Sequence, residues 1–154
     1  MSQSSQKKLR AAWLLSPLLW IGMSMAHASP VFTDAELVTM LKAEGYSVVE
    51  KIESGAVKVK IDGVSYVLFN KEDGDLQAYY GATGLKVSLN TMNEWNKSHR
   101  LSRAYLDSDN DPVLESDLMS DGGMTKGNVL AFFKVFVLSV KQYRDTIMSS
   151  KADH

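Results

Sequence analysis

Cysteine is absent from the 154-residue chain, and proline and histidine are scarce, with three of each. The absence of cysteine excludes disulfides, cysteine-ligated zinc, a thiol nucleophile and a lipidated N-terminal cysteine. If the chain folds in an oxidising compartment, its packing and its association must therefore stabilise it without disulfides.

Clusters of positive charge are missing from most of the chain. Residues 1–28 hold three basic residues and no acid, which leaves 14 basic and 18 acidic residues in the remainder. A weakly acidic domain is a poor ligand for the phosphate backbone of nucleic acids, because binding there needs clustered Lys and Arg. We therefore expect no nucleic-acid partner. The length indicates one domain, and the composition, with 45% hydrophobic and 23% charged residues, is that of a globular protein.

An apolar run near the N-terminus, about residues 11–26, is shorter than the roughly 20 residues that a membrane-spanning helix needs. It follows three basic residues and ends in the small-x-small sequence Ala26-His27-Ala28. This order predicts a signal peptide over residues 1–28 that is cleaved after Ala28, with an uncleaved anchor as the alternative. The mature protein would be periplasmic or secreted and would have no membrane span. We expect residues 29–154 to form a single domain with an ordered core at about 33–148.

The first half of this domain has the signals of a helix followed by an antiparallel meander. Thr33 and Glu36 form a capping-box pattern and Gly45 favours a helix end, which predicts a helix over about 34–44. Runs of β-branched and aromatic residues follow, and the hairpin sequence Asp62-Gly63 separates two of them. Four strands are expected, at about 46–53, 57–61, 64–69 and 76–80.

The second half predicts a helix, two strands and a long helix. Ser88 is placed to cap a helix over about 89–100, in which Leu89, Met92, Trp95 and His99 share the buried face. Strands are expected at about 102–107 and 113–119, and Thr125 should cap a helix over about 126–148. The predicted fold class is α+β: a helix, a four-stranded antiparallel meander, a helix, two strands and a long C-terminal helix packed on the sheet.

The last helix is apolar around nearly its whole circumference, and Lys134 is the one charge within the run. Its apolar residues are Val129, Leu130, Phe132, Phe133, Val135, Phe136, Val137, Leu138 and Val140. Because a sheet can cover only one side of a helix, the opposite side should meet another helix or a second copy of the chain. We predict a homodimer through this helix.

Few residues suggest catalysis or metal binding. The sequence from Asp107 to Asp111 begins like a calcium loop, but Pro112 and Leu118 stand where such a loop needs Gly and Glu. It is interpreted as a solvated acidic turn, with weak calcium binding as the alternative. His99 lies on an apolar face, so it is interpreted as a packed, hydrogen-bonded histidine rather than a general base. We expect no enzymatic activity, cofactor or metal.

The polar segment from Asn93 to Asp117 has a structural interpretation. If its two strands pair around a five-residue loop, Arg103 lies opposite Asp117, and Tyr105 lies opposite Glu115. Either Asn93 or Asn96 is expected to bond to backbone near residues 100–107.

This segment also resembles the YbjN-domain family of bacterial sensory transduction regulators. The residues that carry the resemblance are Asn93-x-Trp95-Asn96-x-x-x-Arg100, Arg103-Ala104-Tyr105-Leu106-Asp107, Asp111-Pro112-x-x-Glu115-x-Asp117 and Gly122-Gly123-x-Thr125. The resemblance implies a bacterial protein with a fold similar to type III secretion chaperones. It carries over no catalytic residue.

Two functions of different classes follow from these observations. The first is an exported, non-enzymatic binding or chaperone-like module, whose unknown protein partner would use the sheet face or the groove beside the last helix. The alternative is a small-ligand-binding protein or an enzyme that uses Arg100, Arg103, Tyr105 and Asp107. That alternative requires a concave pocket that holds Arg103 and carboxylates with shifted pKa values.

Overall fold

Six antiparallel strands form one sheet in this computed structural model, which describes residues 32–152. The predicted signal peptide and its cleavage site lie outside the described residues. The elements are α1 (Asp34–Ala43), β1 (Val48–Glu53), β2 (Ala56–Ile61), β3 (Val64–Asn70), β4 (Leu76–Gly81), α2 (Leu89–Ser98), β5 (Arg103–Leu106), β6 (Pro112–Leu118) and α3 (Lys126–Ala152). The predicted α+β class and element order are confirmed.

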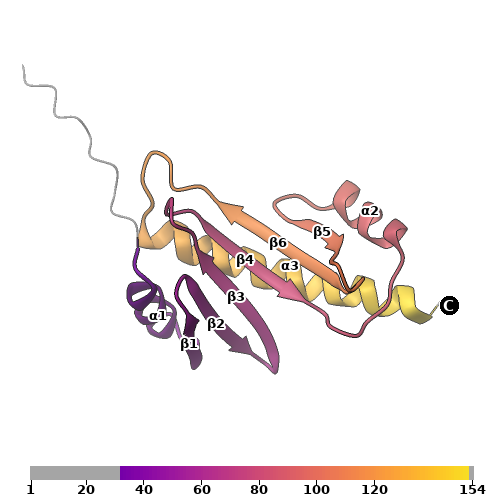
Figure 1. The fold of residues 1–154 in the computed structure, drawn as a ribbon, viewed down its shortest axis with the longest axis horizontal. Helices are drawn as coiled ribbons and strands as arrows, with labels where there is room; N and C mark the ends of the chain where they lie inside the picture. Colours follow the sequence, from indigo (N-terminus) through magenta and orange to yellow (C-terminus); the bar gives the residue numbers. More distant parts are fainter. Residues whose placement is uncertain (1–31, 153–154) are drawn as a thin grey trace, which may run out of the picture.

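The sheet has the strand order β1-β2-β3-β4-β6-β5. The first four strands form the predicted meander, and β6 then pairs with β4, so that β5 becomes an edge strand. The long helix α3 runs along one face of the sheet, α1 lies beside β1, and α2 lies beside β5 (Figure 1).

Local sequence signals act where they were expected. The Thr33 side chain accepts from the N–H of Glu36, whose carboxylate accepts in return from the N–H of Thr33. Asp62 and Gly63 both have positive φ, as a tight β2–β3 hairpin requires. Ser88 caps α2, and Thr125 accepts from the N–H of Asn128 at the start of α3.

The core lies between α3 and one face of the sheet. Six buried residues form a stripe along α3: Val129, Phe133, Phe136, Val140, Tyr143 and Ile147. Their spacing of three and four residues places them on one side of the helix. Phe133 and Phe136 pack edge-on against Tyr66 of β3.

The remaining apolar residues of α3 are covered unevenly. Leu130, Phe132 and Val137 are half-buried, whereas Val135 and Leu138 are exposed. The apolar surface of α3 that is left exposed is therefore smaller than the apolar run suggested. Within residues 32–152, no helix combines the length and the apolar character that crossing a membrane would require.

Two expectations for this half of the chain are wrong. Leu89 is the first residue of α2 and is 72% exposed, because α2 packs through Met92 and Trp95. Arg103 pairs with Glu115 rather than with Asp117, and Tyr105 pairs with Val113 rather than with Glu115.

The register differs by two residues because the five-residue loop begins one position earlier than expected. The N–H of Asp107 donates to the carbonyl of Asp111 at 3.0 Å, which closes the loop at residues 107–111. Leu106 and Pro112 consequently form the last pair of the ladder. A shift of two residues leaves every side chain on its expected face.

Candidate functional site

The residues of the YbjN-like segment meet at one corner of the sheet, where α2 lies against β5. Trp95 is buried, contacts Tyr143 edge-on and donates from its indole N–H to the Ser102 hydroxyl at 3.2 Å. Asn96 makes two hydrogen bonds with the backbone of Ala104: its Nδ2 donates to the carbonyl at 2.9 Å, and its Oδ1 accepts from the N–H at 2.8 Å. The predicted bond from an asparagine to this backbone is confirmed for Asn96.

The outer edge of β5 is thereby occupied. A strand at the edge of a sheet presents alternate N–H and C=O groups outward, and here the Asn96 amide satisfies those of Ala104. Trp95 and Asn96 are thus structural residues that hold β5 against the rest of the fold.

The acidic turn after β5 is ordered by its own carboxylates. Asp107 Oδ1 accepts from the N–H groups of Asp109 at 3.0 Å and Asp111 at 2.9 Å. Asp111 Oδ1 accepts from the N–H of Gly84 at 3.0 Å and from Lys86 Nζ at 3.1 Å. The bonds from Gly84 and Lys86 lower the pKa of Asp111.

Asp107 and Asp111 thus accept hydrogen bonds that close the turn and hold it against Gly84 and Lys86, which accounts for the acidic residues at these positions. Among residues 32–152, no group of three or more His, Cys, Asp or Glu side chains has an arrangement that could hold a metal ion.

His99 is the C-cap of α2, and its ring stacks on Trp95 with centroids 3.6 Å apart. Its Nδ1 lies 2.9 Å from the Ser98 hydroxyl. The interpretation of His99 as a packed, hydrogen-bonded residue is confirmed.

The sheet face that points away from α3 carries a buried carboxylate. Glu115 is 4% exposed, and its two oxygens have different partners. The Arg103 guanidinium pairs with Oε1, and the Tyr105 hydroxyl donates to Oε2 at 2.9 Å. Arg103 also lies over the Tyr105 ring, 5.4 Å from its centroid.

The protonation of this cluster follows from its geometry. Burial and the hydrogen bond to Glu115 raise the pKa of Tyr105 to about 12, and the carboxylate raises the pKa of Arg103. Burial, followed by the nearby carboxylates, raises the pKa of Tyr79, which pairs with Glu115 across the sheet. Near neutral pH the Tyr105 hydroxyl is therefore protonated and the Arg103 guanidinium is cationic.

The remaining candidate residues lie on the surface. Asn93 and Arg100 are exposed on α2 and just after it. Asp117 is exposed on the same face of β6 as Glu115 and accepts from Gln77 Nε2 at 3.1 Å. Asn93 and Arg100 are not among the residues that line the groove or contact Glu115 in the described part of the chain.

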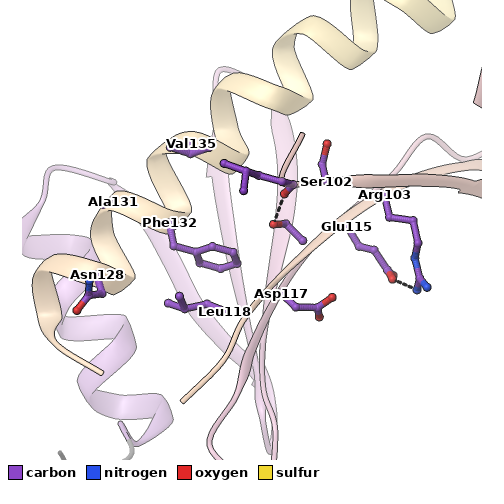
Figure 2. A pocket seen from close by; sticks show the side chains of 11 residues that line it. Ser102, Arg103, Glu115, Asp117, Leu118, Asn128, Ala131, Phe132 and Val135 are labelled. Carbon is purple, nitrogen blue, oxygen red and sulfur yellow. Dashed lines mark hydrogen bonds and ion pairs between the residues drawn. The ribbon is translucent and has the colours of Figure 1, made fainter. Parts of the chain in front are cut away.

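A groove of about 560 Å³ runs between β6 and the N-terminal half of α3. Its lining residues are Leu101, Ser102, Arg103, Glu115, Ser116, Asp117, Leu118, Asn128, Ala131, Phe132 and Val135. Figure 2 shows Phe132 pointing from α3 toward β6 near Leu118, whereas the Arg103–Glu115 pair lies at the far end. The groove is therefore apolar along the helix and charged at the end next to β5.

The sequence pointed to the groove but not to its lining. Arg103, Glu115 and Asp117 were candidates, whereas Phe132 and Val135 were counted among the apolar residues of the last helix and Leu118 was assigned no role. A signal was present, because Phe132 and Val135 fall outside the stripe of six buried residues on α3. It could not be used before the sheet order showed that β6 lies beside this part of the helix.

Comparison with known proteins gives one match. The model of the family described as "YbjN: Putative bacterial sensory transduction regulator" matches residues 33–148. Neither the curated proteins nor the solved structures gave a match.

Proposed function

We propose that this chain, which belongs to the YbjN family, is an exported, non-enzymatic module that binds another protein. Membership suggests a regulatory or binding role, and the YbjN family is not a known enzyme family. The proposal adds three points: that the partner is a protein, that it binds in the groove beside α3, and that binding takes place outside the cytoplasm.

The groove is the observation that supports a protein partner. Binding energy in protein interfaces concentrates where apolar side chains enter a well-formed hollow surrounded by polar groups. Phe132, Val135 and Leu118 provide apolar surface, and Arg103 and Asp117 provide charge at one end. A chaperone-like role would use the same surface to hold an unfolded segment of a client.

The Arg103–Glu115–Tyr105 cluster favours binding over catalysis. A general acid or base needs a proton that substrate can reach. Here both Glu115 oxygens are engaged by protein groups, and the side chain is nearly inaccessible. The cluster fixes the pairing of β5 with β6 and leaves the charge of Arg103 at the surface.

Export rests on the N-terminal sequence. Fractionation of cells that produce the full chain, followed by N-terminal sequencing, tests it directly. We expect the protein in the periplasm with Ser29 as its first residue. A cytoplasmic protein that keeps residues 1–28 would refute export and leave the binding proposal standing.

Site-specific photocrosslinking in the producing bacterium tests the binding proposal. A photoreactive phenylalanine at position 131, on the groove wall, is compared with one at position 141, which is exposed on α3 outside the groove. We expect one recurrent crosslinked protein from position 131 and none from position 141. Equal yields at both positions, or no product at either, would contradict the proposal.

The dimensions of the groove favour one second candidate, a small-ligand site. Its volume of about 560 Å³ lies within the range of small-molecule pockets, and Arg103 stands at its edge. The groove holds Arg103 together with the carboxyl groups of Glu115 and Asp117, which is part of what this candidate requires. Native mass spectrometry of protein purified from the bacterium tests this candidate, because a retained ligand would add a discrete mass that the Phe132→Asp variant lacks.

A further inference from the structure

One side of β6 is left without a neighbouring strand next to the groove. On the other side, β4 pairs with β6 as far as Leu118. On this side, β5 pairs only with Pro112–Glu115, and its first pair is Arg103 with Glu115. From Ser116 to Leu118, β6 therefore has a neighbouring strand on one side only, and its other side is a short free edge.

The orientation of the free backbone groups follows from the ladder. The carbonyl of Pro112 accepts from the N–H of Ala82 on the β4 side at 2.9 Å. Alternate residues of an antiparallel strand direct their backbone N–H and C=O groups to opposite neighbours. The backbone groups of Leu114, Ser116 and Leu118 therefore also point toward β4. Asp117 then presents its N–H and C=O to the side that β5 has left. Among residues 32–152, no backbone hydrogen bond to Asp117 comes from that side.

The chain itself cannot extend β5 to fill this position. Leu101, which the register would place opposite Asp117, has a φ of 66°, outside the range of a strand. Its carbonyl accepts from the Ser116 hydroxyl at 2.5 Å, and the Trp95 indole holds the next residue, Ser102. These contacts fix the segment before β5 in a turned conformation, so the edge at Asp117 stays open.

The groove lies directly beside this edge. Leu118 points toward α3, where Phe132 and Val135 form the opposite wall (Figure 2). Ser116 lies two residues before Leu118 on β6, so its side chain is on the same face of the strand. The side chains of a strand added beside Asp117 would alternate between this apolar wall and the open face of the sheet. One set would enter the groove, and the other would lie beside the Asp117 carboxylate.

The charge at the groove indicates which side chains the added strand should carry on the open face of the sheet. Arg103, Glu115 and Asp117 are the charged residues of its lining, and the first two pair with each other. The carboxylate of Asp117 therefore remains as the net charge. A Lys or Arg on the added strand, on the face of Asp117, would complement it.

Resting on the proposed function, we propose that the free edge of β6 at Asp117 accepts an extended segment of the partner protein as an added β-strand. The backbone of this segment bonds to the N–H and C=O of Asp117. Its side chains alternate, with apolar ones in the groove and a basic one beside the Asp117 carboxylate.

A displayed library of random octapeptides, selected on the purified protein, tests this inference. We expect enriched sequences in which apolar residues alternate and a basic residue occupies an outward position. N-methylation of the peptide residue that bonds to Asp117 should weaken binding at least about fivefold, whereas N-methylation of its neighbour, whose N–H points outward, should change it less than about twofold. The Asp117→Asn variant should bind these peptides about two- to fivefold more weakly, because the charge is lost and the N–H is kept.

The Asp117→Pro variant removes the backbone donor itself. Since this N–H has no partner within the sheet, proline there breaks no ladder bond. We expect a normal circular dichroism spectrum and at least about fivefold weaker peptide binding. If the variant does not fold, the N-methylated peptides and Asp117→Asn carry the test.

The remaining outcomes separate this inference from the proposed function. Enriched peptides with apolar residues at helical spacing, bound equally by the Asp117→Pro variant, would overturn the added strand and leave a protein-binding groove. Selection of no peptide, combined with a second copy of the chain as the crosslinked product at position 131, would overturn the added strand in favour of self-association. Selection of no peptide and no crosslink would overturn both proposals.

Discussion

Replacement of Asp34 by asparagine should destabilise the protein by an amount that decreases in acid. Asp34 lies in the first turn of α1, and its carboxylate joins three parts of the fold. Oδ2 accepts from the N–H of Gly55 at 3.0 Å and lies 2.8 Å from Lys51 Nζ, while Oδ1 accepts from Asn70 Nδ2 at 2.9 Å. The bonds from Lys51, Asn70 and Gly55, in that order, lower the pKa of Asp34 to about 2.

The size of the effect follows from this shift. A fall in pKa from 3.8 to about 2 in the folded state corresponds to about 2–2.5 kcal/mol of stability when the group is ionised. Because the folded pKa is the lower one, this contribution is present above pH 4 and is lost as the pH falls toward 2. About 1.3 kcal/mol should remain at pH 3, and less than about 0.5 kcal/mol at pH 2.

The asparagine variant removes the stability that the ionised carboxylate contributes, and it also places a hydrogen-bond donor against another donor. The Gly55 N–H and the Asn70 amide both donate to Asp34, so the NH₂ group of an asparagine must face one of these donors. We expect Asp34→Asn to lower the free energy of unfolding by about 2–4 kcal/mol at pH 7. Urea unfolding followed by circular dichroism measures this difference.

The pH dependence separates charge from packing. Between pH 7 and pH 3, the difference between the native protein and Asp34→Asn should shrink by about 1 kcal/mol. Asp121→Asn, at an exposed turn residue, is the matched control and should parallel the native protein at every pH. A difference of the same size at pH 7 and pH 3 would refute the assignment of this stability to the ionised carboxylate.

Three further predictions concern the candidate site and α3. Asn96→Ala should cost about 1–3 kcal/mol in urea unfolding, because both of its bonds to Ala104 are lost, whereas Asn93→Ala should stay within about 0.5 kcal/mol. Burial and a hydrogen bond raise the pKa of Tyr105 to about 12, so the native protein should lose stability as the pH rises from about 10 to 12; Tyr105→Phe should flatten this part of the profile. The homodimer through α3 stays a prediction, and the Leu138→Lys variant, altered at a 63% exposed apolar residue, should then sediment as a monomer where the native protein sediments as a dimer.

Local chemistry made much of the fold predictable. Capping by Thr33 and Glu36, the Asp62-Gly63 hairpin and the glycine after α1 act between residues a few positions apart, and each appears in the structure. Such signals need no knowledge of the remainder of the chain. They determined the types of the elements and most of their boundaries.

The predictions were wrong where contacts between distant residues determine the strand register or the buried face of a helix. Two strands around an acidic loop can pair in several registers with the same alternation of faces, and the side chain of Asp107 selects one of them. Leu89 fits a helical stripe, but only the packing of α2 through Met92 and Trp95 shows that Leu89 itself is exposed. Periodicity cannot supply either piece of information.

The candidate site was partly predictable for the same reason. Arg103, Tyr105 and Glu115 stood out because their types and spacing suggested cross-strand pairing, and they do form one cluster. Phe132 and Val135 could not be separated from core residues of α3, since all of them are apolar. Their role depends on β6 lying next to α3, and that depends on β6 pairing with a strand more than thirty residues earlier.

The contacts of the YbjN-like segment connect its structural residues to the proposed binding edge. Trp95 holds Ser102, Asn96 holds Ala104, and Ser116 holds Leu101 in a conformation that a strand cannot continue. Together they make β5 begin only at Arg103, whereas its neighbour β6 continues to Leu118. If the Asn96 bonds were removed and β5 shifted, the edge at Asp117 would lose its defined boundary although Asp117 itself was unchanged. Peptide binding should therefore fall in Asn96→Ala more than in a variant of equal stability loss elsewhere, such as one at the Asp34 network, because only the former alters where β5 begins.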